Sequence, residues 1–307
     1  MRERADLPPP AADEVRIRHT AIGVNFLDVY HRTGANPVPL PSGIGVEAAG
    51  EIVATGDRVA KFKAGDRVAY AGAIGAYSDE RNIAARTLEK IPDGVSDEEA
   101  AALLLKGMTA QFLLTRAYNV RPGDVILVHA AAGGVGSILC QWAKHLGATV
   151  IGTVGSAGKA ATARENGCDE VLVLNGGDFS QDVRRLTAGA GVPVVYESVG
   201  KDTYLHSLDS LKRRGLLINF GNSSGPIPPF DCRLLAAKGS LFLTRPTLPD
   251  YVASPDELAE TAADLFRVVA AKVVRAKIGA RHSLAEANVA HAALEARATT
   301  GSTILVP

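Results

Sequence analysis

Hydrophobic and polar residues follow two different patterns along the chain, and the change lies near residue 125. Before it, short apolar alternations are separated by glycine and proline, as in residues 14–24, 48–55 and 65–72. A period of two between turn residues predicts β-strands. We therefore expect an irregular, β-rich unit in this part of the chain.

After residue 125, continuous apolar segments alternate with amphipathic ones. The apolar segments have the composition of strands buried on both faces of a parallel sheet: VILVHA, TVIGTVG, EVLVL, VPVVYES and GLLINFGN. Helical patterns separate them, near residues 134–146, 157–166, 178–188 and 202–213. The first three should end at Gly147, Gly167 and Gly189, since glycine tolerates the left-handed conformation at a helix end. This alternation predicts a doubly wound sheet.

Three serine–glutamate pairs, each spaced three residues apart, indicate helix starts of the capping-box type. The pairs are Ser96 with Glu99, Ser254 with Glu257, and Ser283 with Glu286. The helix after Ser96 should be bent or tightly packed around Gly107. The last segment, residues 302–307, is predicted to be a strand that is added back onto the first unit.

A glycine-rich turn joins the strand at residues 125–130 to the next helix. In the register Ala131-x-Gly133-x-x-Gly136 it matches the dinucleotide fingerprint, except that alanine replaces the first glycine. Gly133 would let a pyrophosphate approach the backbone, and Gly136 would let helix and strand pack closely. The helix start supplies free N–H groups and the positive end of a dipole. The turn therefore predicts a nucleotide phosphate site.

Charge and cysteine content exclude several classes of protein. The 33 basic residues balance 33 acidic ones, which argues against a broad contact with nucleic acid or an anionic membrane. No apolar run reaches the roughly 18 residues that a membrane span needs. Cys140, Cys168 and Cys232 show no paired spacing, which favours a reducing compartment over a disulfide framework. We expect a cytoplasmic protein with no membrane or nucleic-acid partner.

Five longer segments carry a family resemblance. They are AIGVNFLDVYHRTG, LPSGIGVEAAG, HAAAGGVGSILCQWAKHLGA, YESVGKDTYLHSLDSLKRRGLLINFGNSSG and LEARATTGSTILVP. Together they resemble the NADPH-dependent quinone oxidoreductases, the zeta-crystallin-like branch of the medium-chain dehydrogenase/reductases. The similarity runs over essentially the whole chain.

The resemblance implies an α/β fold with two domains and an active site in the cleft between them. A β-rich, GroES-like catalytic domain would comprise residues 1–108 and 247–307, without the family's first strand. A Rossmann-type domain with a doubly wound parallel sheet, residues 109–246, would bind NADPH. The resemblance also implies a homodimer that transfers hydride from NADPH to a quinone.

The resemblance assigns cofactor contacts, but no catalytic acid or base. The matching positions are Asn25, Phe26, Asp28, Tyr30, Thr109, Gly134, Val135, Gly155, Ser156, Ala157, Gly158, Lys159, Val199, Gly221, Asn222, Ser223, Ser224, Thr244, Arg245, Pro246 and Arg297. Asn25, Asp28 and Tyr30 are either polar groups near the reacting centre or hydrogen-bonded residues of the core. His31 and His129 have no partner that the sequence identifies.

The strand at residues 149–155 indicates NADPH rather than NADH. NAD-specific relatives end this strand in an acidic residue that binds the ribose 2′-hydroxyl. Here the strand ends in Gly155, and no carboxylate follows before Glu165. A 2′-phosphate would meet the Ser156 hydroxyl and the Lys159 ammonium, and by resemblance Arg297. Two positions depart from the family, where Asn36 and Leu174 replace frequent tyrosines.

Zinc is not expected. Zinc-dependent alcohol dehydrogenases of the superfamily carry a ligand histidine in a GHE motif, which corresponds here to Gly45-Val46-Glu47. Valine cannot bind a metal, and no cysteine occurs in the first 139 residues.

The segment GSLFLTRPTL is apolar on alternate residues, which predicts a sheet edge that a second copy extends. Charged residues in place of Leu241 and Leu243 should then give monomers. Two other functions remain open. One is NADPH-dependent reduction of activated C=C bonds in enones or enals, and the other is an NADPH-binding structural or RNA-binding role.

Overall fold

The computed structural model describes residues 6–307, which form two compact units. Unit 1 comprises Met1–Met108 and Val252–Pro307, and unit 2 comprises Thr109–Tyr251. The sequence placed the C-terminal boundary at residue 247. The division falls later because the ring of Tyr251, at the end of α8 (Leu248–Tyr251), stacks on Phe112 with centroids 4.2 Å apart.

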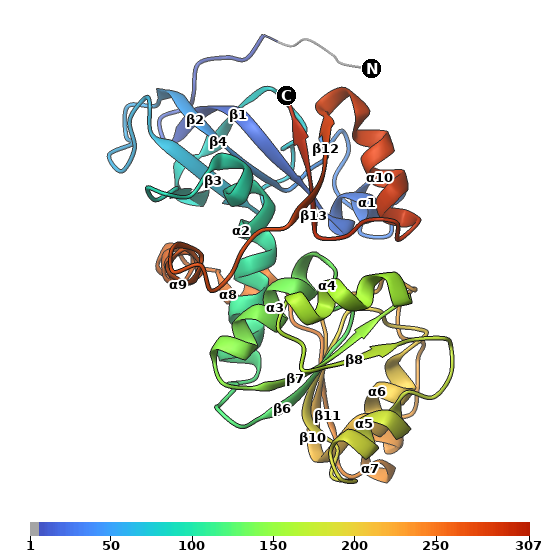
Figure 1. Cartoon of the computed structure of the whole chain (residues 1–307). Helices are drawn as coiled ribbons and strands as arrows, with labels where there is room; N and C mark the ends of the chain where they lie inside the picture. Colours follow the sequence, from blue (N-terminus) through green and yellow to red (C-terminus); the bar gives the residue numbers. More distant parts are fainter. Residues whose placement is uncertain (1–5) are drawn as a thin grey trace. The chain divides into compact units, whose positions relative to one another are not determined.

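Unit 1 is built on a seven-stranded sheet in the order β12-β13-β1-β2-β3-β5, with β4 paired to β1. The strands are β1 (Glu14–Val24), β2 (Glu47–Thr55), β3 (Arg67–Ala71), β4 (Glu80–Ala84), β5 (Leu88–Lys90), β12 (Ile278–Ser283) and β13 (Ser302–Val306). β13 pairs antiparallel with β1, which confirms that the last strand returns to the first unit (Figure 1). Alternate residues of β1 such as Val15 and Ile17 are buried in one core with Ile52 and Tyr70.

The helices of unit 1 include the three that the sequence predicted after Ser96, Ser254 and Ser283. They are α1 (Phe26–Thr33), η1 (Ala85–Thr87), α2 (Asp97–Phe112), α9 (Pro255–Ala270), η4 (Leu284–Glu286) and α10 (Ala287–Glu295). All three capping boxes are formed; at α9, for example, Glu257 N donates to Ser254 Oγ at 3.2 Å. Tight packing at Gly107 is confirmed, since a Cβ there would lie 2.4 Å from Leu265 Cδ1.

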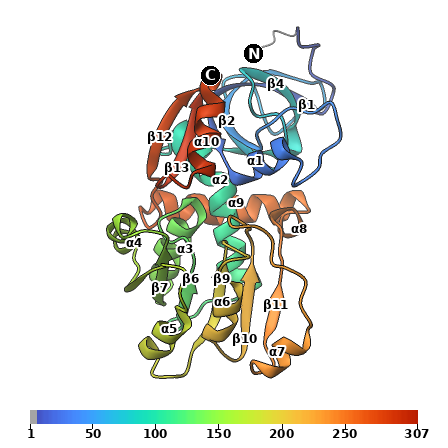
Figure 2. The ribbon, with the colours of Figure 1, turned by 90° about the vertical axis from the view of Figure 1, so that its right-hand side faces the viewer.

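Unit 2 contains a six-stranded parallel sheet in the order β11-β10-β9-β6-β7-β8. Figure 2 shows this order from β11 to β7. The strands are β6 (Val125–Val128), β7 (Thr149–Val154), β8 (Glu170–Val173), β9 (Val192–Glu197), β10 (Leu211–Asn219) and β11 (Phe242–Thr244). From β6 the chain first adds strands on one side and then on the other. The doubly wound prediction is confirmed, and the switch point between β6 and β9 is where such sheets bind ligands.

The helices of unit 2 follow the predicted alternation. They are η2 (Leu113–Ala117), α3 (Gly134–His145), η3 (Ala157–Lys159), α4 (Ala160–Glu165), α5 (Ser180–Leu186), α6 (Tyr204–Ser210), α7 (Arg233–Ala237) and α8. Gly147, Gly167 and Gly189 all have positive φ, which confirms them as helix ends. The helix expected over 202–213 ends at Ser210 instead, because Leu211 already pairs with Val192 in the sheet.

Candidate functional site

The glycine turn after β6 is shaped by two glycines with different surroundings. A Cβ at Gly136 would lie 2.2 Å from the carbonyl oxygen of Ala130, so only glycine fits there. A Cβ at Gly133 would lie 3.1 Å from the same oxygen, a tight contact but not a severe overlap. Gly133 is the N-cap of α3. The first-turn N–H groups of α3, including those of Gly134 and Val135, lack helical acceptors and suit a phosphate.

The end of β7 has room for a second phosphate. A Cβ at Gly155 or Gly158 would meet nothing within 4 Å. Ser156 and Ala157 are exposed beside them, and Lys159 is half-buried at the end of η3. A hydroxyl and an ammonium next to open space, with no carboxylate in this segment, fit a 2′-phosphate.

Two loops at the same edge of the sheet hold the next group of expected residues. One follows β9 and contains Val199, and the other follows β10 and contains Gly221, Asn222, Ser223 and Ser224. Their backbones are joined directly, since Ser223 N donates to Ser198 O at 3.2 Å. The structure therefore brings these five residues to the carboxyl edge of the sheet.

A cavity of about 450 Å³ lies at the ends of β10 and β11. One side is apolar and is formed by Ile227, Phe230 and neighbouring prolines, while Asn219, Asn222 and Arg245 are polar lining residues. Arg245 Nη1 donates to the backbone oxygen of Asn219 at 3.0 Å. Thr244 and Pro246, which flank Arg245, do not line this cavity. Their predicted cofactor contacts rest on the resemblance.

In unit 1, the Asn25 side chain belongs to a buried polar cluster at the start of α1. Its Nδ2 donates to Glu47 Oε2 at 2.9 Å. Lys106 Nζ lies 3.1 Å from the same oxygen, and Leu105 N donates to Glu47 Oε1 at 2.6 Å. Glu47 is fully buried, so its charge is compensated by Lys106 and by these donors.

Asp28 has the environment of a hydrogen-bonded core residue and is fully buried. Its Oδ2 accepts from Asn25 N at 2.8 Å and from the Tyr77 hydroxyl at 3.2 Å, while Oδ1 has no hydrogen-bond partner among residues 6–307. The Tyr77 hydroxyl also lies 2.8 Å from His291 Nε2. Burial raises the pKa of Asp28 to about 7, and the hydrogen bonds from Asn25 and Tyr77 oppose this shift only in part.

The remaining expected residues lie on α1, on α2 and just after α10. Phe26 and Tyr30 lie on α1 with ring centroids 6.0 Å apart, and Thr109 is half-buried on α2. Arg297 is exposed just after α10, with a φ of 56°. Asn36, one of the two departures from the family, lies with its Nδ2 2.9 Å from His31 Nε2.

Sequence reasoning missed the partners of these residues. Lys106, Tyr77 and His291 lie in no local motif, and Glu47 was noted only as the last residue of the segment that corresponds to the GHE motif. The hydrogen bonds that involve these four residues join positions 22 to 214 residues apart. His129 was without an identifiable partner in the sequence, but it lies in a buried polar network of unit 2.

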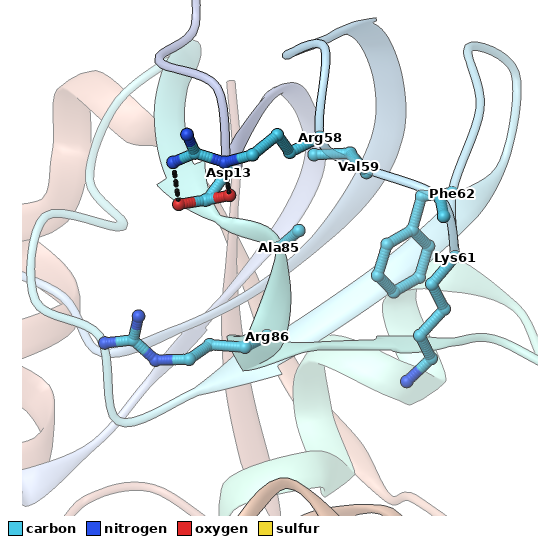
Figure 3. A pocket seen from close by; sticks show the side chains of 8 residues that line it. Asp13, Arg58, Val59, Lys61, Phe62, Ala85 and Arg86 are labelled. Atoms are coloured by element: carbon cyan, nitrogen blue, oxygen red, sulfur yellow. Dashed lines mark hydrogen bonds and ion pairs between the residues drawn. The ribbon is translucent and has the colours of Figure 1, made fainter.

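A second hollow, of about 330 Å³, lies on unit 1 (Figure 3). Arg58 pairs with Asp13, with Nη2 and Oδ2 2.6 Å apart, as Figure 3 shows. Lys61 pairs with Glu89 at 3.2 Å. Its lining includes none of the expected site residues. Because two of its cations are already paired, this hollow is not a candidate site.

The residues present do not fit a zinc site. Within residues 6–307, no group of three or more histidine, cysteine or acidic side chains could hold a metal ion. Cys140 and Cys168 lie with their Sγ atoms 3.4 Å apart in the core of unit 2. In the same described range, no helix is long and apolar enough to span a bilayer.

Comparison with known proteins gives matches over both units. A family model described as alcohol dehydrogenase GroES-like domain matches residues 11–122, and one described as zinc-binding dehydrogenase matches residues 134–267. The quinone oxidoreductase of Pseudomonas aeruginosa is 50% identical over 300 residues, which cover 97% of this chain and 92% of that protein.

Two further relatives add an activity and a ligand to this comparison. A 2-haloacrylate reductase from a Burkholderia species is 45% identical over 314 residues, with 99% of this chain and 94% of that protein covered. The crystal structure of the Escherichia coli quinone oxidoreductase in complex with NADPH has a TM-score of 0.96 at 45% identity. It covers 99% of this chain and 95% of that one.

Proposed function

The chain belongs to the quinone oxidoreductases of the medium-chain dehydrogenase/reductase superfamily, and on that premise we propose that it reduces quinones with NADPH. The observation that supports this most is the glycine turn. It leads into α3, whose first N–H groups are suited to bind a phosphate. The segment after β7 has open space beside Gly155 and Gly158 and contains no carboxylate. The same fold in a relative holds NADPH.

We assign unit 2 as the NADPH-binding domain and unit 1 as the catalytic domain. The N–H groups at the start of α3 would hold the diphosphate, and Ser156 and Lys159 the 2′-phosphate, with Arg297 as a third contact. The loops that contain Val199 and Gly221–Ser224 would hold the nicotinamide half. Bound NADPH supplies hydride, so the protein mainly orients two ligands, excludes water and stabilises charge on the acceptor oxygen.

The reaction is proposed to need no zinc, although one matched family has zinc in its description. Val46 stands at the expected ligand position, and the described residues offer no set of metal donors. We also propose a cytoplasmic homodimer. The exposed edge strand β11 supports the dimer, and the unpaired cysteine pattern supports the compartment.

A panel of acceptors tests this function. Purified protein with NADPH should reduce 1,4-benzoquinone and naphthoquinones faster than the uncatalysed reaction, as measured by loss of NADPH absorbance. Absence of acceleration with every quinone, while NADPH binding is intact, would refute the proposal.

A second candidate is reduction of activated C=C bonds, which the 2-haloacrylate reductase relative favours. Enones, enals and 2-chloroacrylate belong in the same panel. A higher kcat/KM with these compounds than with quinones would select this alternative. NADPH binding without turnover of either class would favour the structural or RNA-binding role, for which the balanced charge offers no support.

A further inference from the structure

A buried network of polar side chains lies at the switch point of the unit 2 sheet. His129 directly follows β6, Thr153 is near the end of β7, and Glu197 ends β9. His129 Nδ1 lies 2.8 Å from Thr153 Oγ1, and its Nε2 lies 2.8 Å from Ser207 Oγ on α6. Ser207 in turn donates to Glu197 Oε2 at 2.6 Å. All four residues are fully buried.

The two hydrogen bonds of Ser207 favour one arrangement of protons in this network, in which His129 Nε2 also lies 3.4 Å from Glu197 Oε2. Ser207 must use its hydroxyl proton toward the carboxylate, so it accepts from His129 Nε2–H. His129 Nδ1 then accepts from the Thr153 hydroxyl. Burial lowers the pKa of His129, which agrees with a neutral ring. The donors therefore point in one direction, from Thr153 through His129 and Ser207 to Glu197, and each bond strengthens the next.

The other oxygen of Glu197 holds the loop that follows β9. Glu197 Oε1 accepts from Val199 N at 2.7 Å, from Gly200 N at 3.0 Å and from Thr203 Oγ1 at 2.9 Å. Two successive backbone N–H groups that converge on one carboxylate oxygen fix the path of the loop. Val199 is one of the residues proposed to contact the nicotinamide half of NADPH.

The anchored loop in turn holds the loop after β10. The backbone N and the side-chain Oγ of Ser224 both donate to Val199 O at 2.8 Å. Lys201 N donates to Gly225 O at 3.0 Å. A Cβ at Gly200 would lie 2.3 Å from Gly225 O, so the two loops are in direct contact. A shift at Glu197 would therefore move both loops.

We propose that Glu197 is a positioning residue for hydride transfer. Together with His129 it links the β6 end, where the diphosphate turn begins, to the two loops proposed to hold the nicotinamide. The network thereby sets the distance between the phosphate and the nicotinamide contacts. This inference rests on the proposed function. In this inference, Glu197 contacts neither ligand and influences the geometry of hydride transfer through Val199 and Ser224.

Replacement of Glu197 tests the inference. Glu197→Gln keeps the shape of the side chain but replaces one carboxylate oxygen, an acceptor, with an NH₂ group, a donor. That NH₂ group would face other donors, either the Ser207 and Thr203 hydroxyls or the N–H groups of the loop. We expect kcat with a quinone to fall at least tenfold, while the dissociation constant of NADPH changes less than threefold, because the phosphate contacts are untouched. The primary isotope effect on kcat, with NADPH deuterated at nicotinamide C4, should rise as hydride transfer becomes rate-limiting.

Two companion variants separate positioning from general stability. In Glu197→Asp, the shorter carboxylate can still accept from the N–H groups of Val199 and Gly200, as aspartate does in turns. The kcat should therefore stay within about threefold of the unmutated value. Asp124→Asn is the matched control. Asp124 accepts from Arg121 N at 2.9 Å at the opposite end of β6, and its replacement should leave kcat and the isotope effect unchanged.

The outcomes distinguish this inference from the function on which it rests. Quinone turnover by the unmutated protein with an unchanged kcat and isotope effect in Glu197→Gln would overturn the positioning role alone. A loss of NADPH affinity as large as the loss of kcat would overturn it as well. If Glu197→Gln does not fold, Thr203→Val and Ser207→Ala, which each remove one donor, must show the raised isotope effect. If the unmutated protein has no turnover, the proposed function fails and this inference with it.

Discussion

We propose that the choice between NADPH and NADH depends on a few side chains, two of which lie at the end of β7. Ser156 is exposed and Lys159 half-buried next to open space, and the segment holds no carboxylate. Because a 2′-phosphate would be bound by charge-assisted hydrogen bonds, each cationic contact is worth about 1.5–3 kcal/mol.

We expect Lys159→Ala and Arg297→Ala each to lower kcat/KM for NADPH roughly tenfold or more, with little effect for NADH. The measurement is the ratio of kcat/KM for the two cofactors in each variant. Lys238→Ala serves as a control, since Lys238 pairs with Asp209 and lies in none of the expected segments. An unmutated enzyme that prefers NADH, or a ratio that neither replacement changes, would contradict this phosphate site.

Asp28 should make stability depend on pH. Its pKa is raised by burial from 3.8 to about 7, so the folded state binds the proton more tightly than the unfolded state does. The free energy of unfolding should therefore fall as pH rises from about 4 to about 7. Asp28→Asn lacks this group, so relative to the unmutated protein it should gain about 3 kcal/mol over that interval.

Urea unfolding at a series of pH values measures this difference. Asp13→Asn is the control, because Arg58 lowers the pKa of Asp13 and its replacement should not reproduce the gain. A constant difference between Asp28→Asn and the unmutated protein at every pH would show that the buried carboxyl does not titrate in this range.

At the scale of elements, the glycine turn before α3 combines a packing position, Gly136, with a proposed ligand position, Gly133. Gly136→Ala would place a Cβ 2.2 Å from the Ala130 carbonyl oxygen, which is backbone and cannot move aside. It should destabilise the fold by about 1–3 kcal/mol. Gly133→Ala would place a Cβ 3.1 Å from the same oxygen, a tight contact but a much milder one, so it should cost less stability than Gly136→Ala while it weakens NADPH binding.

Thermal unfolding and NADPH titration of both variants check this division of roles. Of the two variants, Gly136→Ala should lower the melting temperature more. Gly133→Ala should lower the affinity of the folded protein for NADPH more. Equal effects on both quantities would mean that the two glycines share one role.

The proposed dimer contact lies on the edge strand β11. The burial of the residues in and before this strand decides which substitutions can test the contact. Leu241 is buried inside unit 2, so a charge there would report on folding rather than assembly. Phe242 is 60% exposed and Leu243 37%. Phe242→Lys should therefore give monomers in sedimentation velocity experiments, whereas Val289→Lys, at another exposed apolar position on α10, should not. An unmutated protein that is monomeric at micromolar concentration would mean that this edge has no partner copy.

At the scale of the whole molecule, the proposed chemistry uses no metal. Dialysis of active protein against EDTA should leave kcat/KM for a quinone unchanged, and elemental analysis should find less than stoichiometric zinc. Activity that disappears on dialysis and returns with zinc would show that donors outside the expected motif bind the metal.

The sequence by itself determined many of the elements and the glycine turn of this protein. The capping pairs at Ser96, Ser254 and Ser283 and the glycine ends at Gly147, Gly167 and Gly189 were predictable, because these signals act within a few residues of backbone. The turn at Gly133 was predictable for the same reason, since its glycines, strand and helix are contiguous in the chain.

Only the tertiary structure decided which distant side chains surround the expected site residues. Asn25 is held by Glu47, Asp28 by Tyr77, and His129 by Ser207, across 22 to 78 residues of chain. No periodicity encodes such pairs, because hydrogen bonds between strands and loops depend on how the sheets bring remote segments together. Burial was decided in the same way, since the alternation that made Leu241 look like an edge residue cannot reveal what packs against either face of a strand.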